Sequence, residues 1–384
     1  MKALVDHDNE DIRVEERPKP VLGAAGDAII RVTSSGICGS DLHIYHGDLP
    51  DTHEGDVLGH EFMGIVEEVG PEVRTVRPGD RVVVACFISC GTCWFCQQRL
   101  FSLCDTTNPN PVMQELYGQS LAAAYGYSHL AGGFDGGQAE YVRVPYADVG
   151  CFAVPDGLTD DQVVLLADNL STGWFATDLG DVSPDDTVAV YGCGPVGLLT
   201  LEAARARGAQ RLIAIDAVPY RLDIARQRFA AETINFNEDD PVKTLRELTH
   251  GRGPDVCIEA AGFRYSRTLR HAAQQKLKLE TDAIDALSDA IRSVRKGGRV
   301  VLIGDFIGFA NQFPTGAMME KGLTVRGGQV NAQHYIPTLM ERIQRGELDP
   351  TFVITHHLPL ERAPEAYRLF DRKEDGAVKI ILHP

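Results

Sequence analysis

Hydrophobic and polar positions follow two different patterns along the chain, and the pattern changes near Asp160. Before that point, short apolar runs alternate with turn sequences such as Pro78-Gly79-Asp80, which is typical of a β-rich domain. The clearest of these runs are Ala28–Val32, Gly64–Val69, Arg81–Ala85 and Ala139–Val144. Residues 105–137 are rich in Asn, Pro, Gly and Tyr, and a loop of this length inside a compact domain usually has a function.

After Asp160, segments with a strand pattern alternate with segments with a helix pattern. A first helix is predicted over Asp160–Leu179, interrupted at Ser171-Thr172-Gly173. Further strands are predicted at Thr187–Tyr191, Arg211–Ile215, Val256–Ala260, Val300–Ile303 and Leu323–Arg326, and helices at Val196–Arg207 and Tyr220–Phe229. This alternation indicates a parallel sheet with helices on both faces. The charged stretch Arg270–Arg295 predicts a long solvated helix.

The chain ends with a helix pattern around Tyr335–Arg345 and a terminal strand at Ala377–Leu382. A β segment after the α/β section predicts that the chain returns to complete its first domain. Since 384 residues are too many for one simple core, two domains are expected. We expect an α/β protein in which residues 1–168 and 310–384 form a β-rich domain and residues 169–309 form a doubly wound domain with a parallel sheet.

Composition narrows the possible partners and the compartment. A net charge of −17 argues against nucleic acid and anionic membranes as partners, because both repel an acidic surface. No apolar run approaches the length of a membrane span, and the N-terminus lacks the layout of a secretory signal. We therefore expect a cytoplasmic enzyme that acts on a small molecule. Its nine cysteines should be mostly reduced there, and clustered thiols then indicate metal binding before disulfides.

A glycine-rich turn between a predicted strand and a predicted helix indicates a dinucleotide site. The residues assigned to it are Gly192, Gly194, Pro195, Val196 and Gly197. The glycines allow a tight turn and a close approach to the pyrophosphate, and the helix N-terminus offers free N–H groups. Asp216, at the end of the next strand, suits both ribose hydroxyls and disfavours a 2′-phosphate, so NAD is expected over NADP. Arg221 is the nearby residue that could accommodate such a phosphate.

Four closely spaced cysteines indicate a structural zinc site. They are Cys90, Cys93, Cys96 and Cys104. Four thiolates fill a tetrahedral coordination sphere and leave no open position, so this zinc should stabilise a loop.

Cys38 and His60 indicate a second zinc site, one with catalytic character. A catalytic zinc has three protein ligands and one open position, so a third ligand is needed. The candidates are Glu61, Cys151, Asp168 and Cys193. Asp168 is preferred because it lies at the junction of the two predicted domains. Cys193 is committed to the glycine turn, and Glu61 is expected behind the ligands. Ser40 and His43 are candidates for moving a proton, with Asp41 placed to orient an imidazole ligand.

Taken together, these motifs resemble the zinc-dependent medium-chain dehydrogenases over nearly the whole chain. The marks of the resemblance are Gly36–His43, Gly59-His60-Glu61, the four cysteines and the glycine turn. The resemblance implies a GroES-like catalytic domain beside a Rossmann domain, and a homo-oligomer, dimer or tetramer. The segment Leu166–Trp174 is similar to the glutathione-independent formaldehyde dehydrogenase branch, in which an aspartate replaces a cysteine as the third zinc ligand. The segment Gly136–Val142 and an extended helix around Lys276–Arg295 resemble that branch as well, which implies that the loop at 105–137 covers the cofactor.

The resemblance also implies a mechanism. Zinc binds an alcohol or a hydrated aldehyde, Ser40 accepts its proton, and His43 releases that proton after it has passed the cofactor ribose. Hydride moves to NAD, with Glu61 counted among the catalytic residues and Lys379 placed to contact the cofactor pyrophosphate. Cys86 falls where the family has a pocket wall. The alternatives are a polyol or other secondary-alcohol dehydrogenase of the same chemistry, and a non-catalytic redox sensor that binds zinc and NAD.

Overall fold

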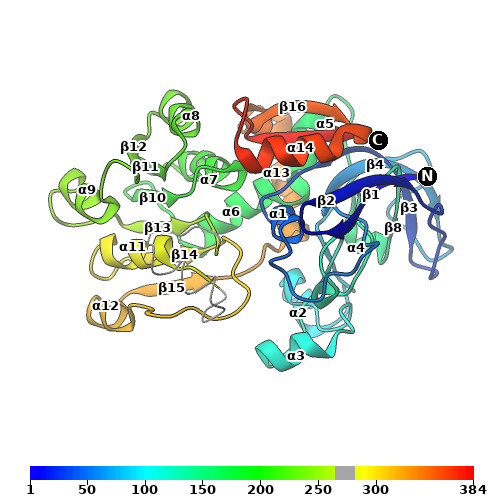
Figure 1. The fold of residues 1–384 in the computed structure, drawn as a ribbon, viewed down its shortest axis with the longest axis horizontal. Helices are drawn as coiled ribbons and strands as arrows, with labels where there is room; N and C mark the ends of the chain where they lie inside the picture. Colours follow the sequence, from blue (N-terminus) through cyan, green and yellow to red (C-terminus); the bar gives the residue numbers. More distant parts are fainter. Residues whose placement is uncertain (264–281) are drawn as a thin grey trace. The chain divides into compact units, whose positions relative to one another are not determined.

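The computed structural model describes residues 1–263 and 282–384, which divide into two compact units. The first unit consists of Met1–Ser171 and Val330–Pro384, and Figure 1 shows it in blue through cyan to green and in orange to red. The second unit is Thr172–Gln329. It continues past the boundary expected at residue 309, because the last strand of its sheet, β15 (Thr324–Gly327), lies beyond that point.

The first unit is built on a seven-stranded sheet with the order β16-β17-β3-β4-β5-β9, in which β8 also pairs with β3. Its strands are β3 (Ala28–Gly36), β4 (Glu61–Val69), β5 (Arg81–Val84), β8 (Tyr141–Val144), β9 (Cys151–Ala153), β16 (Ile354–Pro359) and β17 (Lys379–His383). The last strand of the chain, β17, pairs antiparallel with β3 through Ile381 and Gly36. The C-terminal segment therefore completes the sheet that the N-terminal segment begins.

Short elements surround this sheet. Two small antiparallel pairs accompany it, β1 (Lys2–Asp8) with β2 (Asp11–Glu16) and β6 (Phe87–Ile88) with β7 (Ala123–Ala124). The α-helices are α1 (Asp41–Tyr45), α2 (Trp94–Gln97), α3 (Pro111–Tyr117), α4 (Ala147–Gly150), α5 (Asp160–Val164), α13 (Ala332–Gln344) and α14 (Ala363–Arg372). The 3-10 helices are η1 (Phe101–Leu103), η2 (His129–Ala131), η3 (Leu165–Ala167), η4 (Pro350–Val353) and η5 (Leu360–Arg362). The stretch 105–137 is thus partly ordered as α3, β7 and η2.

The second unit is a six-stranded parallel sheet with the order β12-β11-β10-β13-β14-β15. Its remaining strands are β10 (Thr187–Tyr191), β11 (Arg211–Asp216), β12 (Glu232–Asn235), β13 (Val256–Glu259) and β14 (Arg299–Leu302). Its helices are α7 (Pro195–Ala206), α8 (Pro219–Phe229), α9 (Pro241–Leu248), α11 (Asp285–Ser293) and α12 (Thr315–Glu320), preceded by α6 (Asn169–Leu179), which begins in the first unit.

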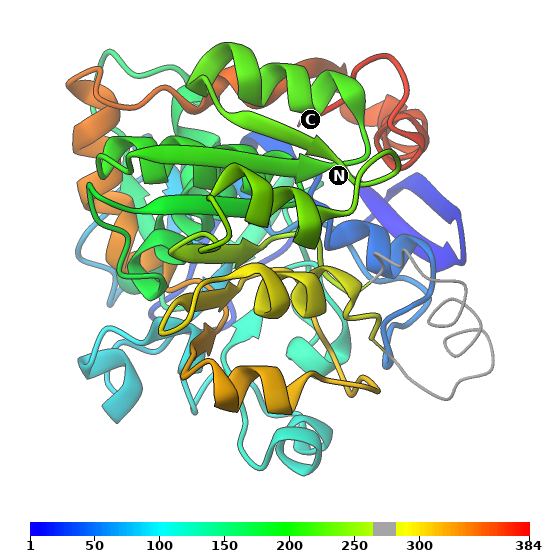
Figure 2. The ribbon, with the colours of Figure 1, turned by 90° about the vertical axis from the view of Figure 1, so that its left-hand side faces the viewer.

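Figure 2 shows helices on both sides of this sheet. Ala189, Tyr191 and Ile213 pack with α9 and α11, whereas Val190 faces α7. Helices on both faces of a parallel sheet confirm the predicted doubly wound fold class. Strand β12 and helix α9 were not predicted.

Two predicted helices differ from the structure. The helix expected over 160–179 is broken at Asp168 and not at Ser171, since η3 ends there and α6 begins with the next residue. Gly173 lies inside α6, where a side chain would come within 2.8 Å of the Leu199 backbone, so it permits close helix packing. The solvated helix expected over 270–295 is wrong for its described part, because most of α11 is buried. The start of the helix predicted over 270–295 falls within residues 264–281, which lie outside the described residues.

Among the helices of the described chain, none has both the length and the apolar character needed to cross a membrane.

Candidate functional site

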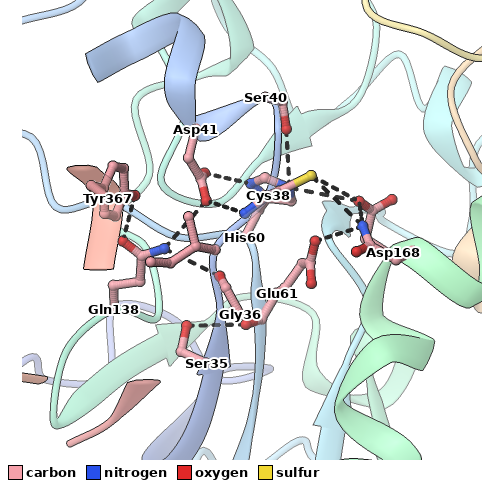
Figure 3. A network of polar contacts seen from close by, with 12 residues as sticks. Ser35, Gly36, Cys38, Ser40, Asp41, His60, Glu61, Gln138, Asp168 and Tyr367 are labelled. Atoms are coloured by element: carbon pink, nitrogen blue, oxygen red, sulfur yellow. Dashed lines mark hydrogen bonds and ion pairs between the residues drawn. The ribbon is translucent and has the colours of Figure 1, made fainter. Parts of the chain in front are cut away.

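Four potential metal ligands converge in the first unit, and we refer to them as the mixed-ligand group. They are Cys38, His60, Glu61 and Asp168, each of which offers one ligand atom within 4.8 Å of the others. Figure 3 shows their side chains close together, with His60 and Glu61 coming from the same segment. The structure thus brings together Cys38, His60 and Asp168, which were predicted as ligands, and places Glu61 beside them.

The sheet of the first unit positions these side chains. Cys38 follows the end of β3, His60 and Glu61 stand at the start of the neighbouring strand β4, and Asp168 lies between η3 and α6. Gly59, directly before His60, has a φ of +101°, and a side chain there would come within 2.8 Å of the Gln138 backbone nitrogen. A glycine at this position therefore allows two backbones to pack closely and directs His60 into the group.

The spacing of the ligand atoms suits a tetrahedral metal ion. Asp168 Oδ2 lies 3.7 Å from Cys38 Sγ and 3.7 Å from His60 Nε2. Metal–ligand bonds of ~2.0–2.3 Å in a tetrahedral zinc site separate neighbouring ligand atoms by ~3.3–3.8 Å. A soft thiolate, an imidazole and a carboxylate are also the donor types that zinc accepts, so the residues present fit this metal.

Asp41 braces two of the ligands from behind. Its Oδ1 atom lies 3.1 Å from His60 Nδ1, and its Oδ2 atom accepts a hydrogen bond from the Cys38 backbone N–H at 2.8 Å. A carboxylate on the far nitrogen of a ligating histidine orients the ring and directs the other nitrogen to the metal. Sequence analysis gave Asp41 this orienting role.

Burial and negative charge dominate the electrostatics of the group. Burial raises the pKa of the Cys38 thiol, and it raises the pKa of the Glu61 carboxyl against the opposing effect of Lys379. Burial lowers the pKa of His60, but the Asp41 and Asp168 carboxylates and the Cys38 sulfur raise it well above 6.5. A buried set of anionic ligands of this kind is suited to a cation.

Lys379 does not have the role that was predicted for it. Its side chain is fully buried, and its Nζ atom donates to Glu61 Oε2 at 2.5 Å and to the Ile37 carbonyl at 2.9 Å. An ammonium enclosed in this way is not available to a cofactor pyrophosphate. The expected contact with the pyrophosphate is therefore replaced by a buried ion pair with Glu61.

Three side chains near the mixed-ligand group were not identified from the sequence, namely Gln138, Tyr367 and Asn169. Gln138 donates to Asp41 Oδ2 at 3.3 Å and accepts from the Tyr367 hydroxyl at 2.7 Å. Asn169 donates to Glu61 Oε1 at 2.7 Å and to Asp168 Oδ2 at 3.0 Å. Two sequence features could have identified them. Gln138 belongs to a segment that resembles a known family, and Asn169 directly follows a predicted ligand.

The two residues predicted to move a proton lie on the same short helix segment. Ser40 Oγ lies 3.3 Å from His60 Nε2, which places the hydroxyl beside the mixed-ligand group. His43 follows three residues later, and its Nδ1 atom lies 4.0 Å from Asp48 Oδ2. Ser40 is the N-cap of α1, and His43 lies inside that helix.

The remaining candidates for a third ligand occupy other places. Cys151 stands in β9 and packs in the hydrophobic core of the first unit. Cys193 belongs to the second unit, where its Sγ atom lies 3.9 Å from the Ile215 carbonyl.

Cys86, expected at a pocket wall, is buried. Burial together with the nearby Asp168 charge raises the pKa of its thiol well above 9.0.

The four predicted structural-site thiols form a second group, the four-cysteine group. They are Cys90, Cys93, Cys96 and Cys104, with one sulfur from each within 4.8 Å of the others. The Cys90–Cys96 and Cys93–Cys104 sulfur distances are 4.0 Å and 3.9 Å. Burial raises the pKa of Cys90, but its hydrogen bonds with Thr106 and Thr92 outweigh this effect and lower that pKa to about 6. Four sulfurs at this spacing suit a closed tetrahedral zinc site.

In the second unit, the glycine turn joins β10 to the N-terminus of α7. Gly192 has a φ of +93°, and a side chain on Gly197 would come within 1.8 Å of the Gly192 carbonyl, so both positions require glycine. Gly194 is the N-cap of α7, Pro195 is its first residue, and Val196 follows. The free N–H groups of such a helix start can bind a phosphate.

The Asp216 carboxylate is fixed beside this turn by backbone donors. Its Oδ2 atom accepts from the Cys193 N–H at 2.6 Å, and its Oδ1 atom accepts from Ala217 and Val218 at 2.7 Å and 2.8 Å. The buried Arg221 brings its Nη1 atom to 3.9 Å from the place where a Gly194 side chain would begin. An acidic and a basic side chain therefore both adjoin the turn.

A β-rich unit with two candidate metal groups and a doubly wound unit with a glycine turn together define the architecture of a zinc-binding dehydrogenase. Residues 24–156 match the model of the alcohol dehydrogenase GroES-like domain, and residues 195–279 match that of the zinc-binding dehydrogenase. A zinc-type alcohol dehydrogenase-like protein of Schizosaccharomyces pombe is 40% identical over 99% of this chain and 90% of its own length. The chain belongs to the zinc-type medium-chain alcohol dehydrogenase family, and it is an enzyme, an oxidoreductase of that type.

Further relatives support the same assignment over the full length. The uncharacterised zinc-type alcohol dehydrogenase-like protein AdhB of Bacillus subtilis is 40% identical, with all of both chains covered. The solved alcohol dehydrogenase TADH from Thermus sp. ATN1 superposes with a TM-score of 0.86 at 37% identity, covering 100% of this chain and 99% of that one. More distant solved neighbours, 26% and 27% identical, are complexes with NADH and with NADP.

Proposed function

We propose that this enzyme oxidises a small alcohol or a hydrated aldehyde such as formaldehyde, with zinc at the mixed-ligand group and NAD as the hydride acceptor. The observation that supports this most strongly is that the ligand atoms of Cys38, His60 and Asp168 lie close together. Both their spacing and their donor types suit zinc. We assign a second zinc, structural in role, to the four-cysteine group.

Zinc bound at the mixed-ligand group supplies Lewis-acid activation, which lowers the pKa of a bound hydroxyl. Ser40 Oγ, beside His60 Nε2, is positioned to accept the proton of that hydroxyl. His43, three residues after Ser40 and inside α1, is our candidate for taking the proton onward, because an imidazole exchanges protons near neutral pH. Glu61 does not take part in this transfer, since its two oxygens are held by Lys379 and Asn169.

The choice of NAD rests on Asp216. An anionic side chain at the end of β11 pairs with ribose hydroxyls and repels a 2′-phosphate. Arg221 beside the same turn is the observation that favours NADP. Three backbone N–H groups hold the Asp216 carboxylate at the turn, and we expect its repulsion of a phosphate to prevail.

The test is an activity panel on protein with a known metal content. We expect two zinc ions per chain and formation of reduced nicotinamide with at least one of formaldehyde, short primary alcohols, 2,3-butanediol or sorbitol. NAD should support a higher kcat/KM than NADP. Activity with sorbitol or butanediol alone would favour a polyol or secondary-alcohol dehydrogenase. If no substrate of the panel yields reduced nicotinamide while both zinc ions and NAD are bound, the catalytic proposal is contradicted and a redox sensor is favoured.

The predicted dimer or tetramer and the predicted cytoplasmic location stay predictions. Light scattering from the purified protein measures the first, and cell fractionation measures the second.

A further inference from the structure

The mixed-ligand group contains one ligand more than a catalytic zinc uses. Cys38, His60, Glu61 and Asp168 all lie within 4.8 Å of one another. Coordination by all four would give a closed, structural type of site, whereas catalysis requires three ligands and an open position. Some feature of the protein must therefore keep one of the two carboxylates away from the metal.

Glu61 is the carboxylate that the protein restrains on both oxygens. Oε2 accepts from Lys379 Nζ, and Oε1 accepts from Asn169 Nδ2 at 2.7 Å. All three side chains are fully buried, so water cannot replace either partner. Each oxygen of the Glu61 carboxylate therefore already has a hydrogen-bond donor, although one of them lies within 4.8 Å of the other ligand atoms.

Asn169 also fixes the carboxylate that remains. Its Nδ2 atom donates to Asp168 Oδ2 at 3.0 Å, and this is the oxygen that lies 3.7 Å from the sulfur and the imidazole. A side-chain amide has two N–H donors, which can serve Glu61 and Asp168 at once. The same Nδ2 atom also lies 3.7 Å from Cys38 Sγ, a longer contact. One residue thus touches both carboxylates.

The charges around it determine which way the Asn169 amide faces. Turning the amide over would direct its carbonyl oxygen at two carboxylates, which is unfavourable. In the observed orientation Oδ1 is buried and has no hydrogen-bond partner among the described residues. Leaving a buried acceptor unpaired costs ~1–3 kcal/mol. The amide therefore keeps its contacts with the carboxylates at the expense of its own oxygen.

We propose that Asn169 is a positioning residue that selects the coordinating carboxylate, holding Glu61 back on Lys379 and presenting Asp168, so that the metal keeps an open position. This inference rests on the proposed metal site. It predicts that removal of the amide donors frees Glu61 Oε1, which then joins the metal and closes the site without loss of the metal.

The test uses Co²⁺ in the mixed-ligand group as a spectroscopic probe and imidazole as a neutral ligand for the open position. The wild-type protein is measured first. Metal bound only at the four-cysteine group in the wild type would refute the proposed function itself, before any variant is compared. Cobalt bound at both groups, with an absorption band that imidazole shifts, establishes the open site on which the inference depends.

The informative variant is Asn169→Leu, which is similar in size and has no donors. We expect it to retain cobalt, to show an altered absorption band, and to bind imidazole at least ~10-fold more weakly, the scale on which partners of metal ligands act. Adding Glu61→Gln should restore the imidazole response, because a neutral amide competes poorly for the metal. Asn169→Ser keeps one donor and should change the absorption band in the same direction as Asn169→Leu, but by a smaller amount.

The matched control is Ser171→Ala. Ser171 lies on the same first turn of α6, is equally buried, and donates to the Leu166 carbonyl at 2.7 Å. It should leave the band and the imidazole affinity unchanged. An unchanged band and affinity in Asn169→Leu would overturn the proposal. Loss of cobalt or failure to fold in both Asn169 variants would also overturn it, because the role would then be structural support and not selection of a ligand.

Discussion

The two candidate metal groups lie in the same unit but are built in opposite ways. The four-cysteine group draws its ligands from Cys90 to Cys104, and its cysteines are themselves most of the small hydrophobic cluster around them, which adds only Ala122 as a buried member. The mixed-ligand group joins Cys38 to Asp168, 130 residues apart, and three of its four ligands adjoin the strands β3 and β4 of the seven-stranded sheet. The segment of the four-cysteine group depends on its own ligands for a core. The mixed-ligand group is supported by a hydrophobic core that does not consist of its ligands.

This difference explains why the two groups should have different roles. A segment with little apolar core gains most of its folding free energy from the metal, which requires a full set of protein ligands. A site supported by a sheet and by buried partners such as Asp41 can leave one coordination position open. We therefore expect removal of the first metal to cost structure and removal of the second to cost activity.

The largest effect is expected from Cys104→Ser. The four-cysteine segment should lose its zinc and unfold locally, because zinc binding in small cysteine-rich sites contributes on the order of 10 kcal/mol to folding. Zinc content should fall by one ion per chain, and limited proteolysis should cut between Cys90 and Cys104. Cys151→Ala is the control, since it removes a buried thiol outside both groups. A variant that keeps both ions and resists proteolysis would contradict the assignment.

A smaller loss is expected from Lys379→Met. Removing one member of a fully buried ion pair leaves the Glu61 charge without its partner, which typically costs ~3–5 kcal/mol. Urea unfolding of the first unit measures this change. Adding Glu61→Gln should recover much of the stability, because the uncompensated charge is then absent. Equal stability of Lys379→Met and the wild type would show that the pair does not support the mixed-ligand group.

The smallest effect is expected from Asp6→Asn. Asp6 lies outside both groups, so this variant tests a pH dependence of the free energy of unfolding that involves neither metal. Burial, together with Asp56, raises the pKa of Asp6 from 3.8 to about 6, and Oδ1 has no hydrogen-bond partner among the described residues. The folded state therefore binds this proton more tightly than the unfolded state. The resulting stability is complete below pH 3.8 and is lost as the pH rises to about 6.

Asp6→Asn should consequently unfold with a free energy ~1–2 kcal/mol higher than the wild type at pH 8, with the difference shrinking toward pH 4. Denaturant titrations at the two pH values measure this, and the exposed Asp8→Asn serves as the control. A stabilisation that is equal at both pH values would show that the Asp6 charge is not its cause.

The comparison of the two groups also shows what sequence could predict. The cysteine spacing indicates the four-cysteine group because its ligands are local, and strand β10 coincides with the predicted Thr187–Tyr191 because a buried parallel strand has a continuous apolar pattern. The break at Asp168 was placed three residues too late, since nothing in a helical pattern marks a ligand that interrupts it. Strand β12 was missed because only one of its four residues is buried.

The partners of the mixed-ligand group were beyond prediction for a physical reason. Lys379 is 318 residues from Glu61, and Tyr367 is 229 residues from Gln138. A lysine in a terminal strand is usually a surface residue, and only the pairing of β17 with β3 buries this one. Local patterns identify the ligands, but the contacts that restrain them arise from the tertiary fold.

The central claim is that one metal is structural and the other catalytic, and chelation tests it most directly. A time course with a chelator should follow zinc per chain, alcohol or aldehyde oxidation, and circular dichroism together. We predict that one zinc leaves first, that activity falls in proportion, and that the spectrum stays unchanged while the second zinc remains. Asp168→Ala should match that intermediate from the start. Full activity with one zinc per chain, or simultaneous loss of both ions with unfolding, would contradict the account.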